Sequence, residues 1–386
     1  MNKDTLLGHI ARPEVGRRPV NAPVQRASTI LFENQAEFDA AQRARHERNQ
    51  LFYGTYGTET VMAFTSALAA LENGYAAIAV SSGLAAIIAT LQTFVGTGEH
   101  VLVPDSVYAP VRIACDGVLR RLGIETTYYD PLLGAGIASL VRPNTRLIYL
   151  ESPGSMTFEV QDVPAIVAVA KSAGIPTAMD NTWATGYFFN ALAHGVDVSI
   201  HAATKYIGGH SDVVLGGIVT TEKFFEPLRK TVSALGYSAS PDDCWLALRG
   251  LRTLGVRLRA HAERAMAVAV YLQERPEIDR VLYPALAGAP GHALWRRDFA
   301  GATGLFSFVF RGDITERAAI AVVDRLRLFA IGASWGGYES LALLLRPALI
   351  RTQPTWNDVG PIVRLSVGLE DPADLVDDLR DAFGAL

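Results

Sequence analysis

The chain has 386 residues, 49% hydrophobic and 19% charged, so it can bury a core larger than one small domain needs. A formal net charge of −4 without a long lysine and arginine block argues against nucleic-acid binding. Only Cys115 and Cys244 are present, too few for a disulfide framework, and neither an apolar signal segment nor a membrane-length apolar run is apparent. We expect a cytoplasmic protein that acts on a small molecule and binds neither nucleic acid nor a membrane.

Residues 1–60 are predicted to form an arm rather than part of a core. They contain many polar residues and prolines, and residues 35–50 have a charged, helix-like pattern. The arm ends at residues 52–60, where Tyr53 and Tyr56 stand among glycines. This composition suits an exposed loop that presents a ring or a hydroxyl group to a partner. Packing of the rings within a turn is the alternative, and these residues alone slightly favour it.

Residues 61–255 alternate between strand-like and helix-like patterns. The expected strands are 75–80, 100–103, 125–129, 146–151, 176–179, 195–200 and 213–220, with helices at 60–72, 84–94, 108–122 and 163–173. This alternation predicts an α/β domain with a mostly parallel sheet, covered by helices on both faces.

The C-terminal part of the chain, residues 256–386, is predicted to form a smaller α+β domain. A helix over 242–274 is expected to link the two domains, with its arginines on a solvated or interface face. Strands are expected at 280–282, 304–310 and 362–367, and helices at 315–325 and 372–383.

Two features of the larger domain could bind a ligand. Ser82 and Gly83 form a small-residue turn before a helix that begins at Leu84, and such a helix end offers unpaired N–H groups to a phosphate. The turn alone is weak evidence, because many α/β turns use serine and glycine for geometry only. Tyr108 and Asp180 lie at or just past strand ends, as does Glu151, and ligands bind at that edge of such sheets.

Lys205 lies in residues 202–212, directly after the strand-like segment 195–200. Burial would lower the pKa of its amine, leaving a neutral, nucleophilic fraction that can form a Schiff base. A solvated surface lysine explains this segment equally well when it is considered alone.

Together these residues match the needs of pyridoxal phosphate. A lysine can carry the cofactor, a carboxylate can pair with its ring nitrogen, a helix end can hold its phosphate and an aromatic side chain can stack on its ring. Nicotinamide binding would require a G-x-G-x-x-G turn, which residues 81–86 lack.

Five ordered motifs carry a more specific resemblance. They are Glu-Ser-Pro-Gly-Ser at 151–155, Met-Asp-Asn-Thr-Trp at 179–183, Ala-Thr-Lys-Tyr at 203–206, Ser-Trp-Gly-Gly-Tyr-Glu-Ser at 334–340 and Arg-Leu-Ser-Val-Gly-Leu-Glu at 364–370. Over nearly its whole length the chain resembles the Cys/Met-metabolism family of pyridoxal-phosphate-dependent enzymes. The resemblance implies fold type I and a homotetramer of two catalytic dimers, whose active sites share residues between subunits.

The resemblance also implies roles for individual residues. Lys205 is the Schiff-base lysine and proton carrier, and the other cofactor-binding residues are Asp180 at the ring nitrogen, Tyr108 stacked on the ring, and Ser82, Gly83, Leu84 and Thr204 around the phosphate. The substrate-binding residues are Arg364 at the α-carboxylate, with Ser334, Trp335 and Asn181, and Tyr53 from the neighbouring subunit. Tyr108 and Tyr53 are also expected to take part in catalysis.

The activity implied is β-elimination of L-cystathionine to homocysteine, pyruvate and ammonia, a step in methionine biosynthesis. Cleavage or synthesis at the γ-bond, broader β-elimination of cysteine S-conjugates, and a non-catalytic regulatory protein on the same fold are the alternatives. Ser155 followed by Met156, together with Trp335, favours β-elimination over γ-chemistry.

Two positions depart from the family pattern. Thr55 stands where the arm motif commonly has a phosphate-binding arginine, and Ala202 stands where serine is frequent. Both changes remove groups that could contact phosphate, so we expect the cofactor to be held more weakly than in relatives that have both.

Overall fold

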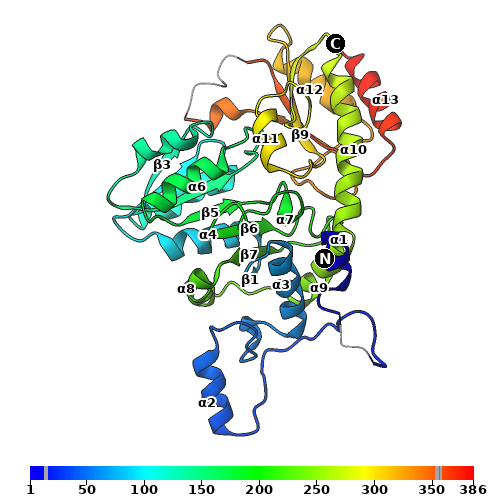
Figure 1. Ribbon diagram of the computed structural model, residues 1–386. Coiled ribbons are helices and arrows are strands. Elements are labelled where there is room, and N and C mark those ends of the chain that lie inside the picture. The colour runs from blue at the N-terminus through cyan, green and yellow to red at the C-terminus, as the bar shows by residue number, and fades with distance from the viewer. Residues whose placement is uncertain (13–15, 353–355, 357–358) are drawn as a thin grey trace.

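The computed structural model describes residues 1–12, 16–352, 356 and 359–386. Figure 1 shows a large sheet in the middle of the molecule, a smaller sheet at one end and an extended arm at the other. Among these described residues, no helix is both long enough and apolar enough to cross a bilayer.

The large sheet confirms the predicted mostly parallel α/β architecture. Its strands within the described chain are β1 (Ala76–Val80), β2 (His100–Pro104), β3 (Glu125–Tyr129), β4 (Thr145–Glu151), β5 (Thr177–Asp180), β6 (Val198–Ala202) and β7 (Gly216–Thr220). They lie in the order β1-β7-β6-β5-β4-β2-β3, and β7 is antiparallel to both of its neighbours. The carboxyl ends of β4, β5 and β6 therefore meet at one edge of the sheet.

Both faces of this sheet are buried, which explains its nearly continuous apolar strands. On β4, Leu147 and Tyr149 pack into one hydrophobic cluster, whereas Ile148 and Leu150 pack into another. The helices of this region are α3 (Glu59–Leu71), α4 (Gly83–Phe94), α5 (Ala109–Ala114), α6 (Val163–Ser172), α7 (Thr185–Phe188) and α8 (Glu222–Ala234). The predicted helix 108–122 is interrupted, because α5 continues into a π-helical segment at Cys115–Leu119.

The smaller sheet confirms the predicted α+β character of the C-terminal part. In the described chain its order is β10 (Ala330–Ile331), β11 (Leu341–Leu345), β12 (Ile362–Ser366), β9 (Leu305–Phe310) and β8 (Ile278–Leu282). Helices α11 (His292–Asp298), α12 (Glu316–Arg325) and α13 (Pro372–Phe383) accompany it. The sequence patterns missed two strands, β10 and β11, and the helices α1 (Lys3–His9), α7, α8 and α11. The division of the chain at residues 60 and 255 stays a prediction.

The predicted linking helix 242–274 is two helices, and one of its arginines is not at the surface. Helix α9 (Pro241–Arg252) ends at Thr253, and α10 (Leu254–Gln273) begins directly after it. Arg257 is buried, and its guanidinium donates to the carbonyl oxygens of Tyr206 at 2.7 Å and Gly250 at 2.8 Å. Arg257 therefore supports the loop that follows Lys205 instead of facing solvent.

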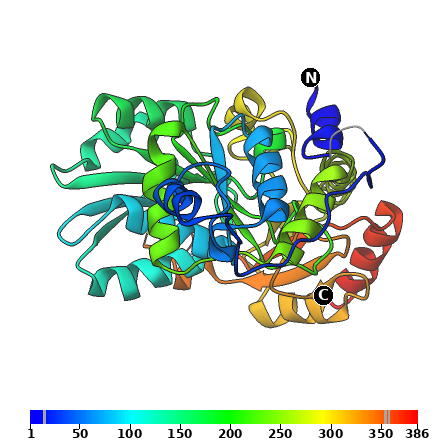
Figure 2. The same cartoon turned by 90° about the horizontal axis from the view of Figure 1, so that it is seen from below.

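The two helices of the predicted arm differ in their contact with the rest of the protein. Helix α2 (Gln35–Ala44) has no buried residue and projects from the end opposite the small sheet, the end from which Figure 2 is viewed. Helix α1 (Lys3–His9) instead packs on the body, where Leu7 is buried and the Lys3 amine donates to the carbonyl oxygens of Gly186 and Tyr187.

Both cysteines lie inside the protein as free thiols. Burial raises the pKa of Cys115 to about 11, and burial likewise raises the pKa of Cys244.

Replacing Arg257 with methionine should destabilise the protein by about 2 kcal/mol or more, because the carbonyl groups of Tyr206 and Gly250 would lose their buried donor. Urea unfolding measures the loss. Arg249→Met is the matched control, since Arg249 is exposed on the preceding helix. Equal unfolding midpoints for the two variants would contradict a structural role for Arg257.

Candidate active site

A cavity of about 240 Å³ lies at the carboxyl ends of β4, β5 and β6, facing the small sheet. Many of the residues predicted or singled out from the sequence line it: Ser82, Gly83, Leu84, Tyr108, Glu151, Ser155, Met156, Asp180, Ala202, Thr204, Lys205, Trp335 and Arg364. The fold therefore brings together side chains from segments nearly 300 residues apart in the chain, from Ser82 to Arg364.

Lys205 is largely buried in the turn after β6. Its amine donates to the Ser334 hydroxyl at 2.9 Å and lies 5.2 Å from the centre of the Trp335 ring. Burial, followed by the nearby Arg364 charge, lowers the pKa of Lys205 to about 8, although the Asp180 carboxylate opposes this shift. The structure thus supports a buried, readily neutralised amine rather than a surface lysine.

Two neighbouring carboxyl groups, those of Glu151 and Asp180, also line the cavity. Glu151 and Asp180 are partners in adjacent parallel strands. Burial raises the pKa of both groups, and the Asp180 charge adds to the shift at Glu151. The Thr182 amide donates to Asp180 at 2.9 Å, while the Glu151 carboxylate accepts from the Tyr108 amide at 2.8 Å. A cation placed beside Asp180 would relieve this crowding of negative charge.

The first turn of α4 provides an anion site. Ser82 is the N-cap, and its hydroxyl accepts from the Ala85 amide at 3.0 Å. The Gly83 and Leu84 amides begin the helix and have no carbonyl partner one turn earlier. Gly83 also allows a close approach, because a Cβ there would lie 2.6 Å from the Ala202 Cβ. The Thr204 hydroxyl accepts from the Leu215 amide at 3.0 Å beside this turn.

The opposite wall of the cavity comes from the small sheet. Arg364 on β12 is largely buried, its guanidinium donates to the Ser334 carbonyl oxygen at 3.3 Å, and burial lowers its pKa.

Tyr108, at the start of α5, is 43% exposed. Burial raises the pKa of the Tyr108 hydroxyl, and the charges of Asp180 and Glu151 reinforce this shift. The Arg364 guanidinium, which lines the same cavity as Tyr108, can bind a carboxylate with two hydrogen bonds.

These residues fit pyridoxal phosphate. The helix end of α4 suits its phosphate, Asp180 suits its ring nitrogen and Lys205 suits its aldehyde carbon. The glycine at position 83 is part of this fit, because a side chain there would collide with Ala202.

Two predicted residues lie elsewhere. Asn181 is fully buried, and its amide nitrogen donates to Glu72 and to the Phe189 carbonyl oxygen, both at 2.7 Å. The structure therefore contradicts the prediction that Asn181 contacts the substrate. Tyr53 is 45% exposed on the arm and is not among the residues that line its own chain's cavity.

Phe158, in the loop after β4, lines the cavity and was not singled out from the sequence, whereas Pro153 lies in one of the motifs and Met156 was already used to favour β-elimination. Met156 and Phe158 have positive φ angles of 71° and 58°. The Ser307 hydroxyl donates to the Met156 carbonyl oxygen at 2.7 Å and holds this conformation. Composition gave no signal for it, since positive φ is uncommon for both residue types.

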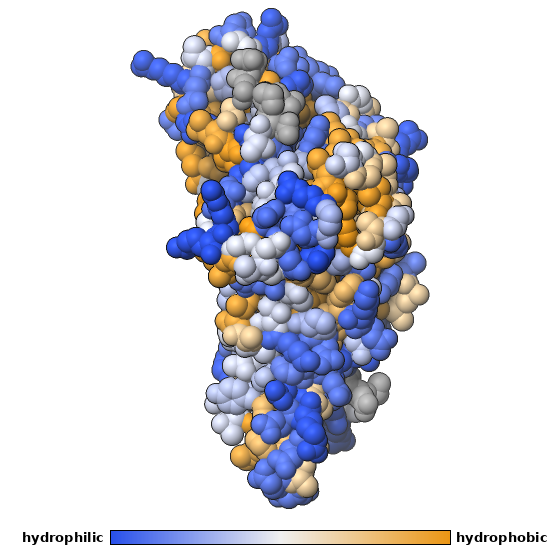
Figure 3. All heavy atoms as spheres, turned by 90° about the vertical axis from the view of Figure 1, so that its left-hand side faces the viewer, coloured by the Kyte–Doolittle hydropathy of each residue, from blue (hydrophilic) through white to orange (hydrophobic). Residues whose placement is uncertain are grey.

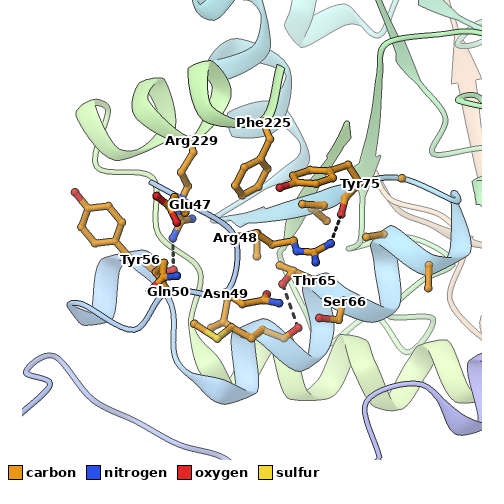
Figure 4. Close-up of a pocket in the computed structure, with 18 residues that line it drawn as sticks. Glu47, Arg48, Asn49, Gln50, Tyr56, Thr65, Ser66, Tyr75, Phe225 and Arg229 are labelled. Atoms are coloured by element: carbon orange, nitrogen blue, oxygen red, sulfur yellow. Dashed lines mark hydrogen bonds between the residues drawn. The ribbon is translucent and has the colours of Figure 1, made fainter. Parts of the chain in front are cut away.

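A separate cavity of about 220 Å³ lies where the arm meets the body, between residues 47–56, α3, β1 and α8 (Figure 4). The Arg48 guanidinium donates to the Tyr75 carbonyl oxygen at 3.0 Å, and Arg229 donates to the Tyr56 carbonyl oxygen. These bonds hold the base of the arm against β1 and α8. Tyr53 is therefore presented outward from a fixed support.

Comparison with known proteins also indicates a pyridoxal phosphate site. Residues 5–384 match the family described as Cys/Met metabolism PLP-dependent enzyme, and the chain belongs to that family. Its cofactor is pyridoxal phosphate, and its fold is that of fold type I.

Individual members of this group show which enzymes the chain is similar to. A putative cystathionine beta-lyase of Rhizobium johnstonii is 48% identical over 95% of this chain and 91% of its own. A cystathionine beta-lyase of Bordetella avium is 45% identical over 98% of this chain and 97% of its own. The solved structure of a cystathionine gamma synthase from Xanthomonas oryzae pv. oryzae, in complex with aminoacrylate and cysteine, has a TM-score of 0.90 and 30% identity, covering 100% of this chain and 98% of that one.

Gly83→Ala should weaken cofactor binding by about tenfold, since overpacking against Ala202 costs about 1–3 kcal/mol and shifts the first turn of α4. Fluorescence titration of the apoenzyme with pyridoxal phosphate measures the dissociation constant. Gly117→Ala is the control, because a Cβ there meets nothing within 4 Å. Unchanged affinity in Gly83→Ala would show that the close approach to Ala202 is not needed for the phosphate site.

Proposed function

We propose that this protein catalyses the pyridoxal-phosphate-dependent β-elimination of L-cystathionine, giving homocysteine, pyruvate and ammonia with the uptake of one water. The observation that carries the proposal is the buried Lys205 amine in one cavity with Asp180 and Arg364. The names of the two similar beta-lyases, matched over nearly the full chain, support cystathionine as the substrate.

Arg364 orients the substrate by binding its α-carboxylate. The guanidinium is already held in place through the Ser334 carbonyl oxygen, so little side-chain entropy is lost when the carboxylate binds. Trp335 lines the same cavity, with its ring centre 5.2 Å from the Lys205 amine. Together these groups exclude water and fix which end of the amino acid enters.

Lys205 moves the protons. With its pKa lowered to about 8, a useful fraction of its amine is neutral near pH 7 to 8 and can accept the proton from the substrate α-carbon. The Ser334 hydroxyl, 2.9 Å away, orients the amine. The protonated amine then returns a proton to the departing sulfur of homocysteine.

The cofactor, when bound, supplies an electron sink that stabilises negative charge at the substrate α-carbon. Asp180 would hold its ring nitrogen, and Tyr108 would lie over its ring. The Gly83 and Leu84 amides, with the Ser82 and Thr204 hydroxyls, would hold its phosphate. Glu151 is held next to Asp180 by the pairing of β4 with β5, and burial beside the Asp180 charge raises its pKa. Glu151 can therefore hold a proton and leave the negative charge at the ring nitrogen to Asp180.

Cleavage at the γ-bond is the nearest alternative. The gamma synthase structure is 30% identical, whereas the two similar beta-lyases are 48% and 45% identical. Met156 and Trp335 line the cavity of this chain and favour β-elimination. Broader β-elimination of cysteine S-conjugates would use the same residues. It differs from the proposed activity only in the substrate, so assays with several substrates distinguish the two.

Product analysis tests the proposal. The holoenzyme should release pyruvate and homocysteine from L-cystathionine, and Lys205→Ala should lower the rate by about 1,000-fold or more, because its proton carrier is lost. A coupled dehydrogenase assay for 2-oxo acids and a thiol analysis by mass spectrometry measure both products, with cystine as a second substrate. Formation of 2-oxobutyrate and cysteine instead would assign γ-elimination, and full activity in Lys205→Ala would contradict its role.

We also infer that the protein works as a homotetramer of catalytic dimers, in which Tyr53 of one subunit enters the cavity of its neighbour. Two observations support self-association. Tyr53 is exposed on a supported arm, and the apolar side chains of Ile113 and Val118 are exposed on α5 and the π-helical segment, with Leu122 just after it. Figure 3 shows the face on the left-hand side of Figure 1, where apolar patches lie among hydrophilic surface.

Thr55→Arg should tighten pyridoxal phosphate binding by about tenfold, because a charge-assisted hydrogen bond from the neighbouring arm to the phosphate contributes about 1.5–3 kcal/mol. Titration of apoenzyme measures the change, and Thr55→Gln is the uncharged control of similar length. Equal affinity of the arginine variant and the native chain would show that Thr55 does not limit the hold on the phosphate.

A further inference from the structure

A fully buried carboxylate, Glu72, lies behind the active site at the end of α3. Its Oε1 atom accepts hydrogen bonds from Asn181 at 2.7 Å, from the Ser199 hydroxyl at 2.7 Å and from His201 at 2.8 Å. Its Oε2 atom accepts from the Ala191 amide at 3.1 Å. A single side chain thus connects the end of α3 to β6, to the residue after β5 and to the loop after α7.

The donors to Glu72 are next to the residues that do the chemistry. Asn181 directly follows Asp180, and His201 lies on β6 four residues before Lys205. Side chains alternate between the faces of a strand, so Ser199 and His201 lie on the face opposite to Ile200, the β5 partner of Asp180. Glu72 therefore links the end of β5 to β6 by hydrogen bonds on the face of the sheet opposite to the cavity.

The other face has its own cross-link. The Thr182 hydroxyl accepts from the Ala202 amide at 2.8 Å, joining the end of β5 to the end of β6 within the cavity lining. The distance between Asp180 and Lys205 is thus constrained from both faces.

The position of the Glu72 carboxylate is itself tightly fixed. A Cβ on Gly186 would lie 2.9 Å from the Glu72 carboxyl carbon, which leaves no space for the group to move that way. Within the described residues, the Nδ1 atom of His201 has no hydrogen-bond partner, so its contacts with Glu72 and Ser199 through Nε2 are what orient the ring. Loss of the carboxylate would leave several buried donors unpaired at once.

We propose that Glu72 is a positioning residue, which sets the spacing of Asp180 and Lys205 through Asn181 and His201 without touching substrate or cofactor. The proposal deepens the proposed function, on which its kinetic readout rests. It also gives Asn181 a role in place of the substrate contact predicted from its motif.

The test compares Glu72→Gln with Asp378→Asn in the holoenzyme. Asp378 is a matched control, because it is a buried carboxylate that accepts from the backbone amides of Arg327, Leu328 and Phe329 in the small domain. Three quantities are measured: the thermal unfolding midpoint, the visible circular dichroism per bound cofactor, and kcat and KM for L-cystathionine.

The expected result for Glu72→Gln is a fall in kcat of about 10- to 100-fold with KM changed less than about threefold, since misplaced reacting groups slow the chemical step. Its cofactor dichroism should fall or change sign, because that signal reports how the bound ring is oriented. Asp378→Asn should lose comparable thermal stability and keep both kcat and the dichroism.

Two outcomes overturn the proposal: native kcat and dichroism in Glu72→Gln, or equal losses of both in Asp378→Asn, which would mark a general effect of destabilisation. If Glu72→Gln does not fold, Asn181→Ala removes one of the two links through which Glu72 is proposed to act, and native kcat and dichroism there would likewise overturn it. The dichroism needs no substrate, so it judges Glu72 even if the native enzyme forms no pyruvate and the proposed function fails.

Discussion

The site depends on keeping the Lys205 amine out of water although Asp180 and Glu151 line the same cavity. Lys205 loses hydration and its pKa falls, yet Asp180 in the same cavity pulls in the opposite direction. Such a balance needs a rigid support, because a shift of one side chain would let water in or let a salt bridge form. The neighbouring parallel strands β4, β5 and β6 give that support. Their carboxyl ends lie side by side and fix the backbone positions from which Glu151, Asp180 and the turn with Lys205 extend.

The small sheet completes the site rather than merely covering it. Arg364 adds a positive charge that lowers the pKa of Lys205 further, and Ser334 accepts a hydrogen bond from the lysine amine. The substrate-binding groups and the proton carrier are therefore linked before any ligand arrives. Relative movement of the two sheets would change the basicity of Lys205 as well as the width of the cavity.

Sequence patterns predicted the parts that repeat along the chain. The alternation of strands and helices located the large sheet, and residues at strand ends, such as Asp180 and Lys205, could be grouped because parallel strands share an edge. Side-chain direction could not be predicted in the same way. Asn181 follows Asp180 but points to the other face, and Arg257 looks like a solvated helix residue until its carbonyl partners are known. These features depend on contacts between segments far apart in sequence.

The two cysteines have a practical consequence. Cys115 and Cys244 are the only thiols in the chain, both are buried, and the pKa of each is raised, so little reactive thiolate is present at neutral pH. The native chain can therefore serve as an almost unreactive background for labelling. A cysteine introduced on the exposed helix α2 could carry a fluorophore, and the movements of the arm could then be followed without first removing any native residue.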